Sequence, residues 1–419
     1  MNAPARRLLR GASALSAAML LANAGNYALN LFLGRVLTPA EFADANLMVT
    51  FLFSLTSIAL CLQLVAARFV ARADELGHSG DSDRLARRLR RIALVSGLGA
   101  GAVLAFGAEF WSTLFRTASP WPFVVLGAGV PFWLVQAVGR GVLQARSLFA
   151  PLALSFVIEM VVRVGSGVLL VSAGYGVVGA TIALSASFVV TCAVVAAVAR
   201  PRGGPVAGSI GRGEVRAYAA LVSILLVGQI IANNSDVFIA KAVLDPTDAG
   251  IYAAVALVGR AVFFLTWSVA TVVFPEAARR QAAGRDSAAV LRAGVGVVIG
   301  IGAACSLGAL WVGGPVLGVV LGPDYSGLSL PLAGYAGATT LFAVANLVAS
   351  YRLSQSRTTE SWLLLGAAVL QTVLLVIEHR DMTALIAMQA VAMSVLVLVL
   401  AVRAVVARSR RTSLEEVLP

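Results

Sequence analysis

Three ionisable residues stand inside long apolar stretches of the sequence, where a charge is costly to keep. Arg260 lies about ten residues into one such stretch, and no acidic residue stands within one helical turn of it. A guanidinium at that depth must pair with an acid from another helix or bind an anionic ligand. Of the two, we favour a cavity cation that binds a phosphate, with an interhelical salt bridge as the alternative.

Arg163 has a candidate partner in its own stretch, because Glu159 precedes it by four residues. This spacing places the two side chains on one face of a helix, with the acid in the favourable N-terminal position. Either the pair is self-neutralising, or Glu159 takes up a proton and releases Arg163 toward a ligand. The second hypothesis would couple a transport cycle to protons.

Polar side chains form two similar stripes at helical spacing. The first consists of Asn23, Asn26 and Asn30, and the second of Gln229, Asn233 and Asp236. Amides that face lipid would be unsatisfied, so both stripes must point into protein or into a wet cavity. Interhelical hydrogen bonding and ligand recognition explain them equally well.

Near the end of the second stripe, Asp236 and Lys241 would form a gate salt bridge or reach interfacial water. Weaker candidates of the amide kind are Gln63, Gln136, Asn346, Gln371 and Gln389. No metal site is expected, because Cys61, Cys192 and Cys305 lie far apart and show no metal-ligand spacing.

The elements that must hold these residues are membrane-spanning helices. The chain of 419 residues is 59% hydrophobic and 12% charged, with a mean hydropathy of +0.90. That is too little polar surface for a soluble enzyme, a nucleic-acid-binding module or a disordered scaffold. Apolar stretches of spanning length predict an all-α polytopic protein with twelve spans, near 11–34, 42–66, 92–115, 120–143, 148–173, 176–199, 217–240, 250–275, 293–320, 327–350, 359–378 and 382–402.

The positive charge of the chain follows the membrane topology. Most of the 32 lysines and arginines fall on alternate hydrophilic segments, counting Arg140 and Arg146 with the loop after the fourth span. By the positive-inside rule, both termini are expected in the cytoplasm. This distribution accounts for the net charge of +12 without a nucleic-acid partner. No Walker-type G-x-x-x-x-G-K-S/T sequence occurs, so no nucleotide or other cofactor is expected.

An internal repeat divides the chain into halves. The segment Leu37–Ala43 reads LTPAEFA, and 207 residues later Leu244–Gly250 reads LDPTDAG. The same offset pairs Asn26 with Asn233 and Arg72 with Arg279. It carries six spans onto six, so the halves enter the membrane in the same direction, as in parallel-repeat transporters. We expect one six-helix bundle over residues 1–205 and another over 206–419.

Several short motifs follow one another along the chain: Leu33–Phe42 (LGRVLTPAEF), Asp236–Phe238, Gly250–Tyr252, Phe274–Arg279 (FPEAAR) and Leu321–Tyr325 (LGPDY). In this order and spacing they resemble the motifs of a known family, the Wzx-like polysaccharide flippases of the multidrug/oligosaccharidyl-lipid/polysaccharide superfamily. One departure is Ala43, where the family usually has glycine. The chain also lacks the two further helices common in lipid II flippases, which favours a capsule, exopolysaccharide or O-antigen substrate.

The resemblance implies two helical bundles around a central cavity. It also implies translocation of a polyprenyl-pyrophosphate oligosaccharide from the cytoplasmic to the outer leaflet of the cell membrane by alternating access. Such a cavity needs a cation for phosphate and polar groups for sugars. The implied partners are the lipid-linked oligosaccharide, membrane lipids, and a polysaccharide polymerase or glycosyltransferases.

Two other functions are alternatives to this one. An enzyme acting on lipid-linked sugars would need a large extramembrane loop, and the outer loops here are short. A cation or drug antiporter of the same superfamily is the nearer alternative. It would be expected to carry carboxylates in its cavity, whereas this chain has more arginine than acid at mid-membrane depth.

Overall fold

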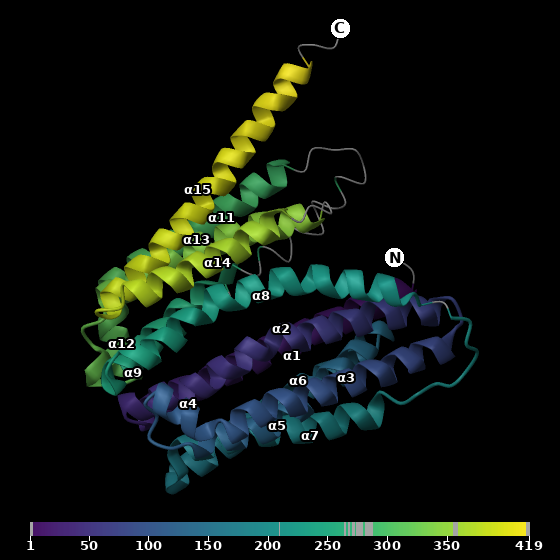
Figure 1. The fold of residues 1–419 in the computed structure, drawn as a ribbon, viewed down its shortest axis with the longest axis horizontal. Helices are drawn as coiled ribbons and strands as arrows, with labels where there is room; N and C mark the ends of the chain where they lie inside the picture. Colours follow the sequence, from purple (N-terminus) through teal and green to yellow (C-terminus); the bar gives the residue numbers. More distant parts are fainter. Residues whose placement is uncertain are drawn as a thin grey trace. The chain divides into compact units, whose positions relative to one another are not determined.

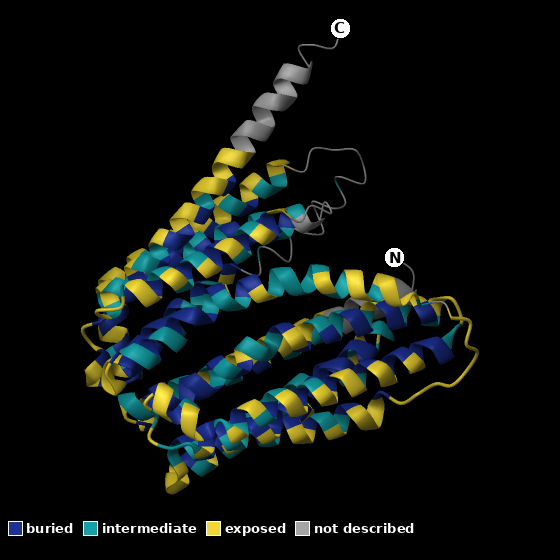
Figure 2. Ribbon diagram, viewed as in Figure 1, coloured by how far each residue is buried: buried dark blue, intermediate teal, exposed yellow. Residues whose placement is uncertain are grey.

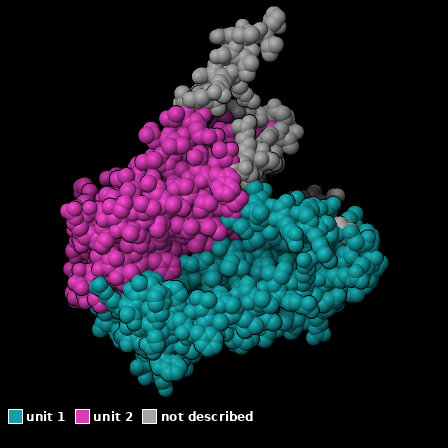
Figure 3. Space-filling view, in the orientation of Figure 1, with its two compact units in different colours: residues 1–223 teal, residues 224–419 magenta. Residues whose placement is uncertain are grey.

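The computed structural model describes residues 3–208, 210–263, 265–266, 269, 273, 280, 288–354 and 359–415. The expected motif Phe274–Arg279, and with it the repeat partner of Arg72, lies outside these residues. The described chain forms two compact units, Met1–Ser223 and Ile224–Pro419 (Figure 3). The expected division at residues 205 and 206 stays a prediction.

Unit 1 consists of long helices that lie side by side (Figure 1). They are α1 (Ala3–Val36), α2 (Pro39–Glu75), α3 (Ser79–Phe106), the short α4 (Ala108–Leu114), α5 (Trp121–Ala145), α6 (Phe149–Leu170), α7 (Gly176–Val198) and the first part of α8 (Arg212–Val243). The central helix is α5, which packs against α2, α3 and α7.

Unit 2 begins within α8 and has a central helix of its own. Its other elements are α9 (Pro246–Gly259), α11 (Ala288–Gly308), the π turn Ala309–Gly313, α12 (Gly314–Val320), the 3-10 turn Pro323–Tyr325, α13 (Ser329–Ser354), α14 (Thr359–Ile377) and α15 (Met382–Glu415). The central helix is α13, which packs against α9, α11, α14 and α15.

The described helices confirm the all-α class, and the predicted span 250–275 lies partly outside the described residues. Nine helical segments of the described chain are long and apolar enough to cross a membrane, and one of them, Phe149–Val198, contains both α6 and α7. Between α6 and α7 the π turn Val171–Tyr175 includes Gly174 with φ +89°, and Gly176 follows with φ +49°. Glycine adopts these left-handed angles without steric cost, which lets the chain reverse direction.

Exposed residues lie along the outward faces of the helices (Figure 2), and many of them are large and hydrophobic, as expected for helices in lipid. Large hydrophobic side chains such as Phe106, Trp311 and Val319 are strongly exposed. Polar side chains such as Gln136, Asp236 and Gln371 are buried instead, because water is not available to satisfy them at this depth.

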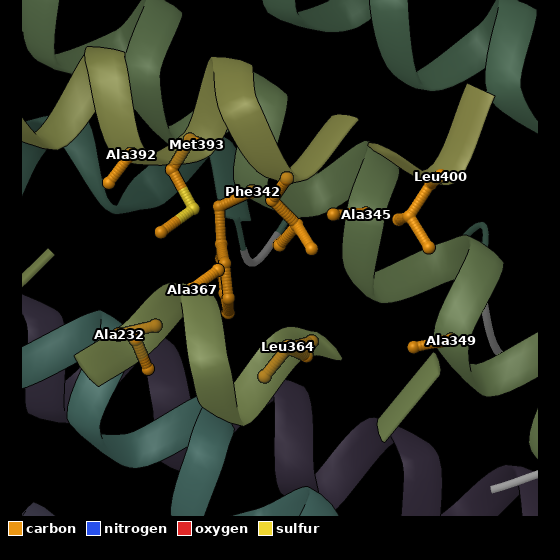
Figure 4. Close-up of a cluster of buried hydrophobic side chains, with 11 residues drawn as sticks. Ala232, Phe342, Ala345, Ala349, Leu364, Ala367, Ala392, Met393 and Leu400 are labelled. Atoms are coloured by element: carbon orange, nitrogen blue, oxygen red, sulfur yellow. The ribbon is translucent and has the colours of Figure 1, made fainter. Parts of the chain in front are cut away.

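The core of unit 2 between α8, α13, α14 and α15 is built largely from alanine and leucine. In Figure 4, Phe342 of α13 is surrounded by the smaller side chains of Ala232, Ala367 and Met393. Small residues let helix backbones approach closely. Within a bilayer the hydrophobic effect does not drive helices together, so dispersion contacts stabilise this packing. This packing fixes the positions of α8 and α13.

Segment 199–208, which follows α7, is fastened to the corner between α2 and α3. The Asp83 carboxylate accepts hydrogen bonds from the backbone N–H groups of Arg202 and Gly203 at 2.9 and 2.8 Å. Arg146 forms ion pairs with Asp74 at 3.2 Å and with Asp83 at 3.0 Å. These bonds hold the helix ends of unit 1 together around a polar network.

Candidate functional site

A polar cluster joins α5 and α6 in unit 1, and we call it the α5–α6 cluster: Gln136, Arg140, Glu159 and Arg163. Arg163 Nη2 pairs with Glu159 Oε1 at 2.5 Å. Arg140 Nη2 pairs with the other carboxylate oxygen, Oε2, at 2.7 Å, and Gln136 Nε2 donates to the same oxygen at 3.0 Å. Gln136 and Arg140 are four residues apart on α5, and Glu159 and Arg163 are four residues apart on α6. Each pair therefore lies on one face of its helix, and the two faces are turned toward each other.

The guanidinium of Arg163 is also held by two other helices. Its Nη1 donates to Asn26 Oδ1 of α1 at 3.2 Å, and its Nε donates to Ser187 Oγ of α7 at 3.3 Å. The guanidinium carbon lies 5.3 Å from the ring centre of Phe188. Arg163 therefore connects α6 to α1 and α7.

Arg140 was not recognised as a site residue from the sequence, and its assignment to the loop after the fourth span is wrong. It lies inside α5 and is 6% exposed. Its Nε and Nη2 donate to the hydroxyl and the backbone oxygen of Ser155, both at 3.1 Å, and its guanidinium carbon lies 4.0 Å from the ring centre of Phe156. Its spacing of four residues from Gln136 is the only sequence signal that indicates this position.

The α5–α6 cluster contains two positive charges and one negative charge, so its net charge is positive. Two guanidinium groups share the single carboxylate of Glu159. In the part of the chain that the structure describes, neither arginine is in salt-bridge contact with a second acid. An uncompensated charge in a membrane helix is unfavourable, so this cluster favours an anion as an additional partner.

A second cluster joins α8, α9 and α13 in unit 2, and we call it the α8–α13 cluster: Asp236, Tyr252, Arg260 and Tyr335. Arg260 Nη2 pairs with Asp236 Oδ1 at 2.9 Å. Both tyrosine hydroxyls donate to Asp236 Oδ2, at 3.0 Å from Tyr252 and 2.7 Å from Tyr335. Arg260 Nε also donates to the Tyr335 hydroxyl oxygen at 3.0 Å.

This second cluster is electrically neutral and nearly closed to solvent. Asp236 is fully buried, and the side chain of Arg260 is 15% exposed. Of the two alternatives for Arg260, the structure contains the interhelical ion pair. Lys241 is buried in the last turn of α8, and the carboxylate contacts described for Asp236 go to Arg260 and the two tyrosines.

The amide stripes are held by hydrogen bonds within each unit. Asn30 Nδ2 donates to the backbone oxygen of Asn26 at 2.9 Å, and Asn233 Nδ2 donates in the same way to Gln229 at 2.9 Å. Gln229 Nε2 donates to Asn346 Oδ1 of α13 at 2.6 Å. Two of the predicted amides contact a predicted ionisable residue among the described contacts: Asn26 contacts Arg163, and Gln136 contacts Glu159.

Sequence reasoning also missed Tyr335, and it included Tyr252 only within a motif. A tyrosine in an apolar helix is indistinguishable from a packing residue until its hydroxyl has a known partner. No group of three or more His, Cys, Asp or Glu side chains in the described chain is arranged to hold a metal ion.

Comparisons with known proteins address the fold and the family. The profile of a family described as polysaccharide biosynthesis protein matches residues 8–281. No curated protein matches the chain significantly.

Three solved structures of low sequence identity share the fold. An inward-facing multidrug resistance MATE family transporter of the MOP superfamily has a TM-score of 0.81 at 14% identity, covering 98% of this chain and all of its own. The lipid II flippase MurJ in an inward closed conformation scores 0.71 at 12% identity, with coverage of 92% and 86%. A MOP superfamily transporter from Pyrococcus furiosus scores 0.53 at 15% identity, with coverage of 95% and 94%.

Proposed function

Because the chain belongs to the polysaccharide biosynthesis protein family, we propose that it moves a polyprenyl-pyrophosphate oligosaccharide from the cytoplasmic to the outer leaflet. The protein is a multi-pass membrane protein with the fold of MOP superfamily transporters and flippases, which are not enzymes. The proposal adds the substrate, the direction and an alternating-access cycle.

The observation that carries the proposal is the excess positive charge of the α5–α6 cluster. Glu159 is shared between Arg140 and Arg163, so a pyrophosphate oxygen can satisfy the charge that remains. Guanidinium groups match phosphate with parallel hydrogen bonds. Arg163 is the better placed of the two, since its side chain is 13% exposed and that of Arg140 is 8% exposed.

The neighbouring amides supply the polar groups that sugars require. Asn26 already accepts a hydrogen bond from Arg163, and Asn30 lies one turn further along α1. We assign sugar contacts to these two residues and to Gln229 and Asn233 on the repeat-related helix α8. Arg260 and Asp236 then stabilise unit 2, and Lys241 lies near the expected outer gate.

Glu159 is the candidate coupling residue. Both of its carboxylate oxygens contact arginines, so protonation would release two cations at once toward an anionic substrate. We expect transport by the wild-type protein to respond to an imposed pH gradient, and transport by Glu159→Gln to be independent of it. An equal response in both proteins would remove this coupling role.

A cation or drug antiporter is the second candidate function, and the likeness to a MATE family transporter favours it. The charge sign separates the two functions, because a cationic drug needs surplus carboxylate where the α5–α6 cluster has surplus arginine. The Pyrococcus furiosus relative is described with a binding pocket of reverse polarity that suggests a different function. We infer from this precedent that one fold serves ligands of either charge.

The proposed location is the cell membrane, with both termini in the cytoplasm, where a glycosyltransferase would supply the substrate and a polymerase would consume it outside. Reporter fusions after residues near 30, 205 and 415 test the topology. Cytoplasmic signals at the last two positions and an external signal near the end of α1 are expected, and the reverse pattern would contradict the orientation.

The function itself is tested by deleting the gene and analysing lipids. We expect lipid-linked oligosaccharide to accumulate on the cytoplasmic side, with loss of surface polysaccharide and recovery on complementation. Normal surface polysaccharide with altered sensitivity to cationic drugs would instead establish the antiporter function.

A further inference from the structure

A groove of about 760 Å³ runs between α3 and α5 on unit 1. Its floor is formed where the two helices cross at glycines. A Cβ added to Gly101 would lie 2.3 Å from the backbone oxygen of Gly127, and one added to Gly127 would lie 2.5 Å from that of Gly101. Because the helices touch through their backbones here, no side chains fill the space beside the crossing.

The walls of this groove, the α3–α5 groove, are apolar. From α3 they include Leu94 and Leu98, which are 44% and 55% exposed, and from α5 Ala128 and Phe132. Along α3 the lining extends from Arg90 to Phe106, which is about 24 Å at the helical rise per residue. Its volume is in the range of sites that hold a drug-sized ligand, and its length and apolar walls suit a hydrocarbon chain.

The polar side chains at the groove are almost confined to one end. Arg90 and Arg91 line that end, and the only other lining residue with a polar atom in its side chain is Cys192. Arg90 Nη2 donates to the backbone oxygen of Ala199 at 2.8 Å, which holds its guanidinium in place, and Arg91 is exposed. An apolar channel with two cations at one end is complementary to an amphiphile with an anionic head.

We propose that the α3–α5 groove binds an anionic phospholipid, with an acyl chain between the helices and the headgroup phosphate at Arg90 and Arg91. Basic pockets between membrane helices bind such headgroups. The lipid would be a resident partner of unit 1 and would fill the hollow left by the glycine crossing.

The groove and the α5–α6 cluster lie on different sides of α5. The groove contains Val124, Ala128, Pro131 and Val135, from which Arg140 is rotated by roughly 120° to 180° at 3.6 residues per turn. Only Phe132, at the edge of the groove, lies closer in rotation to Arg140, at about 80°. A substrate whose pyrophosphate binds Arg140 and Arg163 would therefore have to pass around α5 to reach most of the groove. This separation favours a phospholipid over the lipid-linked substrate as the occupant.

Lipid retention by the purified full-length protein tests the proposal. Native mass spectrometry would compare phosphatidylglycerol with phosphatidylcholine of the same acyl chains. We expect the wild type to retain phosphatidylglycerol preferentially, and Arg90→Gln/Arg91→Gln to bind it roughly 30-fold more weakly, from the usual contribution of two arginines near a headgroup.

Two further variants separate a site from a general effect of charge. Arg87→Gln/Arg88→Gln removes the same charge from exposed positions of α3 outside the groove, and we expect phosphatidylglycerol binding within about threefold of wild type, below the contribution of a single headgroup arginine. Ala128→Trp fills the groove without changing charge, and we expect it to reduce retention of phosphatidylglycerol even if the first variant fails to fold.

Three results of the phospholipid measurements would overturn the proposal. They are equal retention of the two phospholipids by the wild type, equal losses in the two arginine double variants, and wild-type retention by Ala128→Trp. Retention of a polyprenyl phosphate in place of phosphatidylglycerol would assign the groove to the substrate carrier and would also overturn it.

Discussion

The two polar clusters use the same chemistry in different proportions. In unit 1 one carboxylate, Glu159, serves two guanidinium groups. In unit 2 one carboxylate, Asp236, serves one guanidinium and accepts two further hydrogen bonds from tyrosines. Both clusters use the central helix of their unit, α5 or α13, so their difference lies in charge rather than in architecture.

The balance of charge distinguishes a cluster that only holds helices together from a cluster that binds a ligand. A buried ion pair whose remaining hydrogen-bonding groups are satisfied can be kept without a ligand, although it adds little net stability. A cluster with a surplus cation is stabilised further when an anion arrives. We therefore assign the substrate phosphate to unit 1 and a structural role to the α8–α13 cluster.

The internal repeat strengthens this contrast. The charged residues of each cluster have no charged counterpart at the repeat-related position of the other half. At the offset of 207 residues, Glu159 and Arg163 correspond to Gly366 and Leu370, and Asp236 and Arg260 correspond to Leu29 and Phe53. The amide pair Asn26 and Asn233 does repeat. The two halves thus share a corner motif and one amide position, while each has its own ionic cluster.

The largest effect is expected from Glu159→Gln. This change leaves Arg140 and Arg163 buried without their carboxylate, and breaking a buried ion pair from one side costs about 3–5 kcal/mol. Thermal unfolding in detergent would show the loss of stability, and the transport that remains should no longer respond to a pH gradient. The control is Gln136→Ala, which removes only a neutral contact to the same carboxylate; equal midpoints for Glu159→Gln and wild type would refute the shared-carboxylate description.

Arg163→Gln makes unit 1 resemble unit 2, because Glu159 keeps Arg140 as its single cation. We expect the protein to remain folded and transport to fall roughly 10- to 100-fold, the value of a charged hydrogen bond to the substrate. Transport of a fluorescent lipid-linked oligosaccharide in proteoliposomes would measure this. Arg163→Lys keeps the charge and should lie between the two, whereas wild-type rates for Arg163→Gln would remove the anion site from unit 1.

Unit 2 gives the converse test. Asp236→Asn and Arg260→Gln each leave a buried partner unpaired, while the double variant removes both charges and should recover part of the lost stability. A coupling free energy of about 1–3 kcal/mol is expected in thermal unfolding. Transport by the double variant should stay close to wild type, and its complete loss in a folded protein would return Arg260 to the substrate site.

Much of this arrangement was predictable from local sequence. Hydropathy gave the spans, and the spacing of Glu159 and Arg163 gave their pair. The partner of Arg260 was not predictable, since Asp236 lies on another helix and no local pattern fixes how two helices face each other. Arg140 was assigned to a loop because it lies five residues from the end of its helix. At that position the sequence does not distinguish a buried arginine from a basic loop residue that sets the membrane orientation.

The smallest expected effect compares the two repeat corners. Before α2, Thr38 Oγ1 accepts from the Glu41 N–H at 3.3 Å, and the Glu41 carboxylate accepts from the Thr38 N–H at 3.0 Å, which makes a complete capping box. Before α9, Asp245 occupies the same position without a side-chain capping bond.

Thr38→Ala should therefore cost about 1 kcal/mol, the usual value of an N-cap, and Asp245→Ala should cost only a fraction of that. Thermal unfolding of the two variants under one set of conditions measures the difference. If Asp245→Ala were the more destabilising change, the corner of unit 2 would depend on a contact other than capping, and the similarity of the two repeats would be confined to their backbones.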